Sequence, residues 1–242
     1  MSEQQLRFFA STPSRCGYLP DRDSVSLFAD PDFAMTPGLY GHLINHGFRR
    51  SGEFVYRPYC PQCNACLPVR ILADEFKPSR RHRRIWRQNQ DINVRVLKSA
   101  FNEEHAQLYT RYIQARHSGG SMDDPDPDRY RGFMYSHWCD TDYIEFRLNQ
   151  KLVGMAVTDR VKQGVSAFYT FFDPDLSRRS LGTFAILWQI HYCQQLGLPY
   201  VYLGYWIAEC EKMNYKSEYQ PQEIWLDDQW QTLDELAKQP GR

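Results

Sequence analysis

The order of hydrophobic patterns between residues 143 and 203 constrains the fold of this chain more than any other feature of its sequence. Apolar and polar residues alternate from Tyr143 to Leu148, and a second apolar segment, Leu152–Val161, follows after the polar residues 149–151. Alternation with a period of two residues is typical of β-strands, so these segments predict a hairpin. Val165–Phe172 predicts a third strand, which ends at Asp173-Pro174.

A helix and a further strand follow this hairpin. Leu181–Gln195 predicts a helix that ends at Leu196-Gly197-Leu198-Pro199, and Tyr200–Leu203 predicts a short strand. The order hairpin, strand, helix, strand resembles the core of the Gcn5-related N-acetyltransferase fold, in which the turn before the helix holds the acyl donor. The acyl-CoA members carry R/Q-x-x-G-x-G/A in that turn, and residues 179–184 match it in part. We therefore expect a mixed α/β fold, with an acetyltransferase-like C-terminal domain.

The N-terminal part has a different composition. Residues 11–70 are rich in Pro, Gly, Cys and Tyr, which predicts short strands and turns. Asn102 is expected to cap an amphipathic helix that runs to about Arg116, and residues 118–130, rich in Gly and Asp, predict a loop. Because 242 residues suffice for two small domains, we predict a Cys-rich domain over residues 1–98 and a transfer domain over residues 99–242.

Cysteines are concentrated near the N-terminus. Cys60, Cys63 and Cys66 form a C-x2-C-x2-C pattern, and Cys16 offers a fourth thiolate from a separate turn. A two-residue gap lets sulfurs converge on one centre, so these residues are candidate ligands of zinc or of an iron–sulfur cluster. Buried free thiols are the alternative. The other three cysteines, Cys139, Cys193 and Cys210, are expected to be core thiols.

The localisation follows from what the sequence lacks. The first ten residues carry no basic leader, and the apolar stretches are short compared with the ~18 residues of a membrane helix. An odd number of cysteines, seven, also argues against a secreted disulfide framework. We expect a cytoplasmic protein that has no membrane partner.

A basic segment is the strongest charge asymmetry in a chain whose Lys plus Arg (29) equal its Asp plus Glu (29). Its cations have no acidic neighbours in the sequence, so a helix here would bring like charges together at i, i+3 and i, i+4. His82 and Trp86 lie among them as possible stacking groups for nucleotides. The segment predicts contact with nucleic-acid phosphates, with a solvated helix face as the alternative; its arginines are Arg80, Arg81, Arg83, Arg84 and Arg87.

Several catalytic classes find no support in the sequence. It has no G-x-S-x-G elbow and no P-loop, and no serine or cysteine lies in a recognisable local setting with a histidine. The segment 204–216, in contrast, reads G-Y-W-I-x-x-C-x-K-M-x-Y-K and resembles a signature of the arginyl-tRNA–protein transferase family. Further matches occur in order along the chain from about Cys16 to Trp225: Cys16–Tyr18, Gly47–Gly52, Tyr56–Pro58, Cys66–Arg70, Tyr169–Asp173 and Ser180–Gly182.

The resemblance is closest to the bacterial branch of that family. It implies an aminoacyltransferase that moves leucine from leucyl-tRNA to proteins with N-terminal Asp or Glu, and thereby marks them for N-degron proteolysis. Eukaryotic relatives, which are described as binding an iron–sulfur cluster, have C-x-x-C where this chain reads Cys16-Gly17-Tyr18-Leu19. A cluster would therefore need Cys60 or Cys63 as a substitute ligand. No cofactor is required for the transfer itself.

The implied reaction suggests roles for individual residues. An aminoacyl ester is already activated, so the enzyme has to place a neutral α-amine and stabilise an oxyanion. Backbone N–H groups at Leu181 and Gly182 are candidates to hold the oxyanion or the terminal ribose, and Tyr169 is a candidate to orient a substrate. An acidic acceptor calls for a buried cation; the candidates for acceptor binding are Arg49, Arg50, Lys212, Tyr215 and Lys216.

Two other functions remain open from the sequence. A CoA-dependent N-acetyltransferase would share the C-terminal fold, although the glycine signature is incomplete. A non-catalytic metal-ribbon protein that binds RNA would account for the cysteines and arginines together, but it leaves the K-M-x-Y-K segment unexplained.

Overall fold

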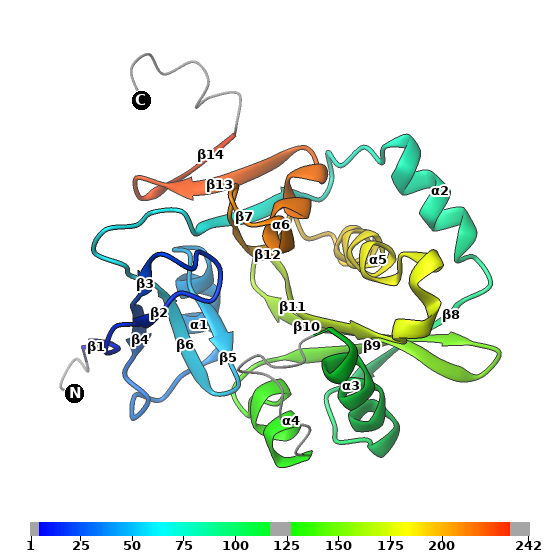
Figure 1. Ribbon diagram of the computed structural model, residues 1–242, viewed down its shortest axis with the longest axis horizontal. Coiled ribbons are helices and arrows are strands. Elements are labelled where there is room, and N and C mark those ends of the chain that lie inside the picture. Colours follow the sequence, from blue (N-terminus) through cyan, green and yellow to red (C-terminus); the bar gives the residue numbers. More distant parts are fainter. Residues whose placement is uncertain (1–4, 117–126, 233–242) are drawn as a thin grey trace.

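An eight-stranded mixed sheet dominates the computed structural model, which describes residues 5–116 and 127–232 (Figure 1). Its strand order is β14-β13-β7-β12-β11-β10-β9-β8. The bounds of its strands are β7 Leu67–Leu72, β8 Asn93–Lys98, β9 Thr141–Leu148, β10 Lys151–Val161, β11 Gly164–Phe172, β12 Tyr200–Trp206, β13 Gln222–Leu226 and β14 Gln229–Thr232.

The arrangement predicted for the C-terminal half is confirmed. β9, β10 and β11 pair antiparallel, and β12 returns parallel to β11 after helix α5 (Leu181–Gln195). The expected cap of helix α3 (Glu103–Arg116) is also present, because Oδ1 of Asn102 accepts from the N–H of Glu104 at 2.8 Å. The chain therefore has the mixed α/β architecture that its periodicity indicated, and the element order that resembles the acetyltransferase fold is present.

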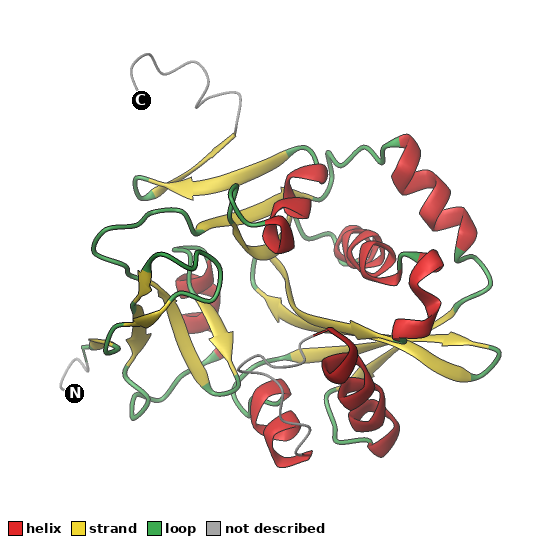
Figure 2. Ribbon diagram, viewed as in Figure 1, coloured by secondary structure: helices red, strands yellow, loops and turns green. Residues whose placement is uncertain are grey.

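Helices cover both faces of the large sheet (Figure 2). On one face α5 and α2 (Arg80–Gln88) bury an aliphatic core with β7 and β10–β12. On the other face α3 and α4 (Pro127–Met134) enclose an aromatic core that includes Tyr109, Tyr143 and Phe171. The loop predicted for residues 118–130 is thus partly wrong, since α4 begins at Pro127; residues 117–126 lie outside the described part.

The N-terminal residues form a separate, four-stranded sheet of order β1-β4-β6-β5. Helix α1 (Pro37–Ile44) packs on one face of this sheet through Tyr40, Leu43 and Ile44. Strands β7 and β8, however, belong to the large sheet, so that sheet crosses the boundary expected at residue 98. The remaining strands are β1 Phe8–Ala10, β2 Ser14–Arg15, β3 Asp23–Ser24, β4 Ser26–Ala29, β5 Arg49–Ser51 and β6 Phe54–Pro58, and the short helices are η1 Pro174–Arg179, α6 Glu211–Asn214 and η2 Tyr215–Glu218.

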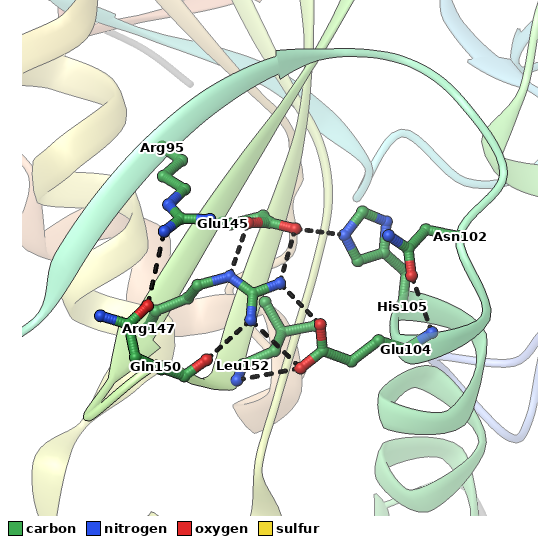
Figure 3. A network of polar contacts seen from close by, with 8 residues as sticks. All are labelled: Arg95, Asn102, Glu104, His105, Glu145, Arg147, Gln150 and Leu152. Atoms are coloured by element: carbon green, nitrogen blue, oxygen red, sulfur yellow. Dashed lines mark hydrogen bonds and ion pairs between the residues drawn. The ribbon is translucent and has the colours of Figure 1, made fainter.

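A polar network holds the start of α3 against β9 (Figure 3). Arg147 donates to Glu145 at 2.7 Å and to Glu104 at 2.6 Å, and Nε2 of His105 donates to Glu145 at 2.7 Å. The hydrogen bond from Arg147, opposed by burial, lowers the pKa of Glu145 to about 2. The network fixes the position of the helix that carries Tyr109 and Tyr112.

Among the described residues, no helix combines the length and apolar character needed to cross a bilayer.

Candidate functional site

The site lies where two parallel strands separate. The β11–β12 register covers Gly164–Ser166 against Tyr200–Tyr202, yet β11 continues to Phe172 and β12 to Trp206. Beyond this register the strands diverge, and backbone groups that would pair in a continuous ladder need other partners. The divergence leaves a split between the two strands. We call it the β11/β12 split.

Arg49 fills part of the β11/β12 split. It comes from β5 in the small sheet, and its Nη2 donates to the carbonyls of Ala167 at 2.9 Å and Phe168 at 3.1 Å. Its Nη1 is buried and has no hydrogen-bond partner among the described residues. A buried guanidinium nitrogen without a partner is costly, and an incoming anion would satisfy it.

Lys216 lies at the same split, and it is 5% exposed. Its Nζ donates to the carbonyl of Tyr205 on β12 at 2.6 Å. Burial, and then the charge of Arg49, lowers the pKa of Lys216 to about 7. Arg49 and Lys216, two predicted acceptor-binding cations from different halves of the sequence, therefore lie close to each other.

The other predicted acceptor-binding residues are placed differently. Arg50 points to the opposite face of β5, where its Nε and Nη2 each donate to the carboxylate of Asp159 at 2.8 Å. Both side chains of this pair are 0% exposed, so Arg50 holds the two sheets together and does not face the β11/β12 split. Lys212 is exposed on α6. Tyr215 is 43% exposed as a residue, yet burial of its phenol raises the pKa of Tyr215, and the charge of Arg49 opposes that rise.

The start of α5 lies beside the end of β11. Ser180 adopts a left-handed conformation with φ of 52°, and its side chain does not cap the helix. A Cβ on Gly182 would lie 3.1 Å from the Phe172 ring. The first N–H groups of a helix have no intrahelical acceptor and carry partial positive charge, so those of Leu181 and Gly182 suit an oxyanion or a ribose hydroxyl. The structure places Gly182 next to the end of β11, and the role of these N–H groups stays a prediction.

Tyr169 lies on the diverging half of β11. Its hydroxyl is buried and, in the described part of the chain, has no hydrogen-bond partner. Burial raises the pKa of Tyr169, and Tyr112 and Tyr109 on α3 add to this shift. The phenol is therefore neutral at physiological pH, and its hydroxyl keeps an unused hydrogen-bonding capacity within the described part of the chain.

Helix α2 presents its arginines to solvent. Arg80, Arg83, Arg84 and Arg87 are exposed, while Arg81 forms an ion pair with Glu218. The nucleotide-stacking role considered for His82 and Trp86 is not supported by their positions. His82 is 1% exposed and stacks on Tyr219 at 5.0 Å between ring centroids, and Trp86 packs on Phe184 of α5.

The four N-terminal cysteines lie near one another, since Cys16, Cys60 and Cys63 all act on the thiol of Cys66. Burial, and then Cys16, Cys60 and Cys63, raises the pKa of Cys66 to about 12. In residues 5–116 and 127–232, no three His, Cys, Asp or Glu side chains converge on a possible metal position. Binding of zinc or of a cluster by these thiols therefore stays a prediction. Cys139, Cys193 and Cys210 are buried, as predicted.

Gly204 is a site residue that the sequence analysis overlooked. It has φ of +82° in the interior of β12, and a Cβ there would lie 2.4 Å from Nη1 of Arg49. Only glycine allows the guanidinium to reach this position. A glycine inside a predicted strand is a recognised sign of close backbone approach, and this signal was available from the sequence.

The fold and the site define an enzyme of the acyltransferase type. A model of the N terminus of arginine-tRNA-protein transferase matches residues 14–84, and a model of its C terminus matches residues 104–226. The chain belongs to this family.

Curated relatives agree with this assignment. An aspartate/glutamate leucyltransferase of Alcanivorax borkumensis is 49% identical and covers 95% of each chain. One of Saccharophagus degradans is 47% identical over 95% of this chain and 98% of its own. Among solved structures, a C-terminal domain of a putative lysylphosphatidylglycerol synthetase from Agrobacterium fabrum has a TM-score of 0.48 and 12% identity, over 80% of this chain and 62% of that one.

Proposed function

We propose that this protein transfers leucine from leucyl-tRNA to the N-terminal α-amine of proteins that begin with Asp or Glu. The names of the curated relatives support this substrate pair. The structural observation that carries the proposal is the unpartnered, buried Nη1 of Arg49 beside Lys216 in the β11/β12 split. The reaction takes place in the cytoplasm and creates an N-degron.

The chemistry is a direct aminolysis. The neutral α-amine attacks the leucyl carbonyl carbon, a C–N bond forms, and the ester bond to the tRNA ribose breaks. The amine loses a proton and the ribose oxygen leaves as a hydroxyl. An α-amine has a pKa of about 7.7 to 8.0, so a useful fraction is neutral without a strong base. Positioning and oxyanion stabilisation at the start of α5 supply the catalysis.

The acceptor is selected by its carboxylate. Arg49 donates through its free Nη1, and a carboxylate next to Lys216 favours the ammonium form of that lysine. A neutral acceptor would leave Arg49 unpaired, and a site with unpaired buried polar groups discriminates strongly. Burial of both cations also strengthens binding, because water would weaken their electrostatic attraction to the substrate carboxylate.

The donor approaches from the side of α2 and α5. The exposed arginines of α2 bind tRNA phosphates, and the contact of Trp86 with Phe184 keeps α2 beside α5. Gln88 ties the end of α2 to the carbonyl of Arg178 in η1 at 3.0 Å, directly before α5 begins. The aminoacylated end would thereby reach the α5 N-terminus while the tRNA body rests on α2.

The donor is tested by labelled transfer. Purified protein is mixed with leucyl-tRNA, arginyl-tRNA or acetyl-CoA and with peptides that begin with Asp, Glu, Lys or Ala. We expect label only from leucyl-tRNA and only on the Asp and Glu peptides. Acetyl transfer without tRNA would establish a CoA-dependent acetyltransferase instead. Tight RNA binding without any transfer would indicate a non-catalytic RNA-binding protein.

Metal content is separate from this chemistry, since the ester needs no metal to react. Zinc or iron–sulfur binding by Cys16, Cys60, Cys63 and Cys66 remains a prediction, and it would require these thiols to move toward one centre. Elemental analysis of protein purified with and without oxygen tests it directly.

A further inference from the structure

The uncovered face of the small sheet forms a groove of about 740 Å³. It is lined by aromatic side chains from three strands, Phe9, Phe28, Phe54 and Tyr56. Phe9 is 49% exposed and Phe54 is 54% exposed, which is unusual for large apolar side chains gathered on one surface. Helix α1 packs on the opposite face, so no helix among the described residues fills this groove.

Strand register connects the groove to the β11/β12 split. Phe9 is paired with Phe28, Phe28 with Tyr56, and Tyr56 with Arg49. Paired residues in an antiparallel sheet point to the same face, so these four form one row across the sheet. The Phe28 and Tyr56 rings lie 5.7 Å apart, and the row ends at the cation proposed to bind the acceptor carboxylate.

The length of the row fits a short peptide. Strands lie ~4.8 Å apart, so the row from Arg49 to Phe9 spans three spacings, roughly 14 Å. An extended chain advances ~3.3 Å per residue and would cover that span with about four residues. We propose that the groove binds the acceptor residues directly after the N-terminal Asp or Glu, about positions two to five, and prefers apolar or aromatic side chains there.

Charge distinguishes this occupant from nucleic acid. The groove is lined by one arginine and two aspartates, Arg7, Asp30 and Asp32, and Arg7 is paired with Asp30 at 2.8 Å. A phosphate backbone would meet surplus negative charge there, whereas a neutral or basic peptide would not. Helix α2, which carries the exposed arginines, lies across the molecule from the small sheet (Figure 1). The tRNA and the acceptor therefore approach the split from different sides.

The inference rests on the proposed function and is tested by two measurements on the full chain. Peptides that share an N-terminal Asp and carry Phe-Leu or Ser-Ser at positions three and four are compared with the dipeptide Asp-Gly. Binding is followed by fluorescence anisotropy without tRNA, and transfer is followed as kcat/KM with leucyl-tRNA. We expect the Phe-Leu peptide to exceed the Ser-Ser peptide by about 10-fold or more in both measurements, because it buries apolar surface in the groove.

Variants locate the effect. The double variant Phe9→Ala, Phe54→Ala should lose the advantage of the Phe-Leu peptide and leave transfer to Asp-Gly unchanged. Phe101→Ala is the matched control, since Phe101 is 42% exposed and does not line the groove. Equal rates for the three acceptors with the unmodified protein would overturn the inference, and so would a double variant that raises only the KM for leucyl-tRNA. Groove-dependent binding without transfer would reject the proposed function and keep the groove.

Discussion

Arg49 and Arg50 show that neighbouring residues of the same type can have unrelated roles. Side chains alternate between the two faces of a strand, so one guanidinium enters the β11/β12 split and the next one is buried against Asp159. The sequence places both arginines in one motif. Only the pairing of β5 with β6 and the position of Asp159, 109 residues away, decide which one is free to bind substrate.

Gly204 allows a direct test of the position of Arg49. In Gly204→Ala the new Cβ would lie 2.4 Å from Nη1, so the guanidinium has to move. We expect kcat/KM for acidic acceptors to fall at least ~10-fold, with a stability loss of about 1 to 3 kcal/mol from the strained backbone.

Gly197→Ala is the matched control for this variant. Gly197 also has a positive φ, 65°, but nothing lies within 4 Å of its added Cβ. Thermal unfolding should show a similar loss of stability in both variants, and only Gly204→Ala should lose transfer. Equal loss of transfer in the two variants would mean that strain, and not the displacement of Arg49, is the cause.

At the level of elements, α2 separates structural from substrate-facing side chains. A capping box of Ser79 and His82 starts the helix, and His82 and Ile85 are buried. Within the described chain, only two of the exposed arginines make structural contacts: Arg81 forms an ion pair with Glu218, and Arg83 donates a hydrogen bond to the carbonyl of Pro78. This division supports a role in binding phosphates.

The salt dependence of transfer tests that role. In Arg80→Gln, Arg84→Gln two phosphate contacts are lost, and each contact contributes about 0.7 to 0.9 to the slope of log affinity against log salt. The slope for leucyl-tRNA should therefore become smaller by roughly 1.5, while KM for the acceptor peptide stays the same. Arg95→Gln, on exposed strand β8, is the control. An unchanged slope in the double variant would remove α2 from tRNA binding.

The elements that could be predicted from the sequence are those with a clear period. α5 has the predicted bounds, and the strands β9–β12 agree to within a few residues, because alternation reports which side of a strand is buried. The four-stranded N-terminal sheet could not be predicted in this way, because strands of three to five residues do not show a clear hydrophobic period. The insertion of β7 beside β12 is a long-range pairing that no local pattern encodes.

For the site, residue types were predictable and geometry was not. The sequence indicated Arg49 and Lys216, and both donate to carbonyls of the strands that border the β11/β12 split. Tyr169 lies on β11, and the start of α5 lies beside the end of that strand. The sequence also suggested Arg50, which is buried elsewhere, because a cation that binds substrate and one that joins two sheets look alike in sequence. The aromatic row in the small sheet depends on strand register and was not expected.

For the whole molecule, the network around Glu145 predicts how stability responds to acid. The pKa of Glu145 is lowered to about 2 in the folded protein, below the usual value near 4.3 for a glutamate. The unfolded chain therefore binds more protons between these values, so the stabilisation is complete above pH ~5 and is lost as the pH falls toward 2.

A variant measures this contribution. Glu145→Gln should lower the free energy of unfolding at pH 7 by about 3 kcal/mol and flatten its decline in acid. Glu103→Gln changes an exposed carboxylate in the first turn of α3, the helix that the network holds against β9, and should leave the profile unchanged. Denaturant titrations at pH 7, 5 and 3.5 give the comparison. A steep acid decline that persists in Glu145→Gln would place the responsible carboxyl elsewhere.

We propose that buried cations in the β11/β12 split select the acceptor by its carboxylate, and an isosteric pair of acceptors tests this role most directly. Leucine transfer is measured on two peptides that differ only in an N-terminal Asp or Asn. The unmodified protein should favour Asp by at least ~100-fold in kcat/KM. Lys216→Met should remove most of this preference, and Lys212→Met, on the exposed face of α6, should retain it. Equal use of Asp and Asn, or a loss in Lys216→Met that is the same for both peptides, would show that these cations do not select the acceptor.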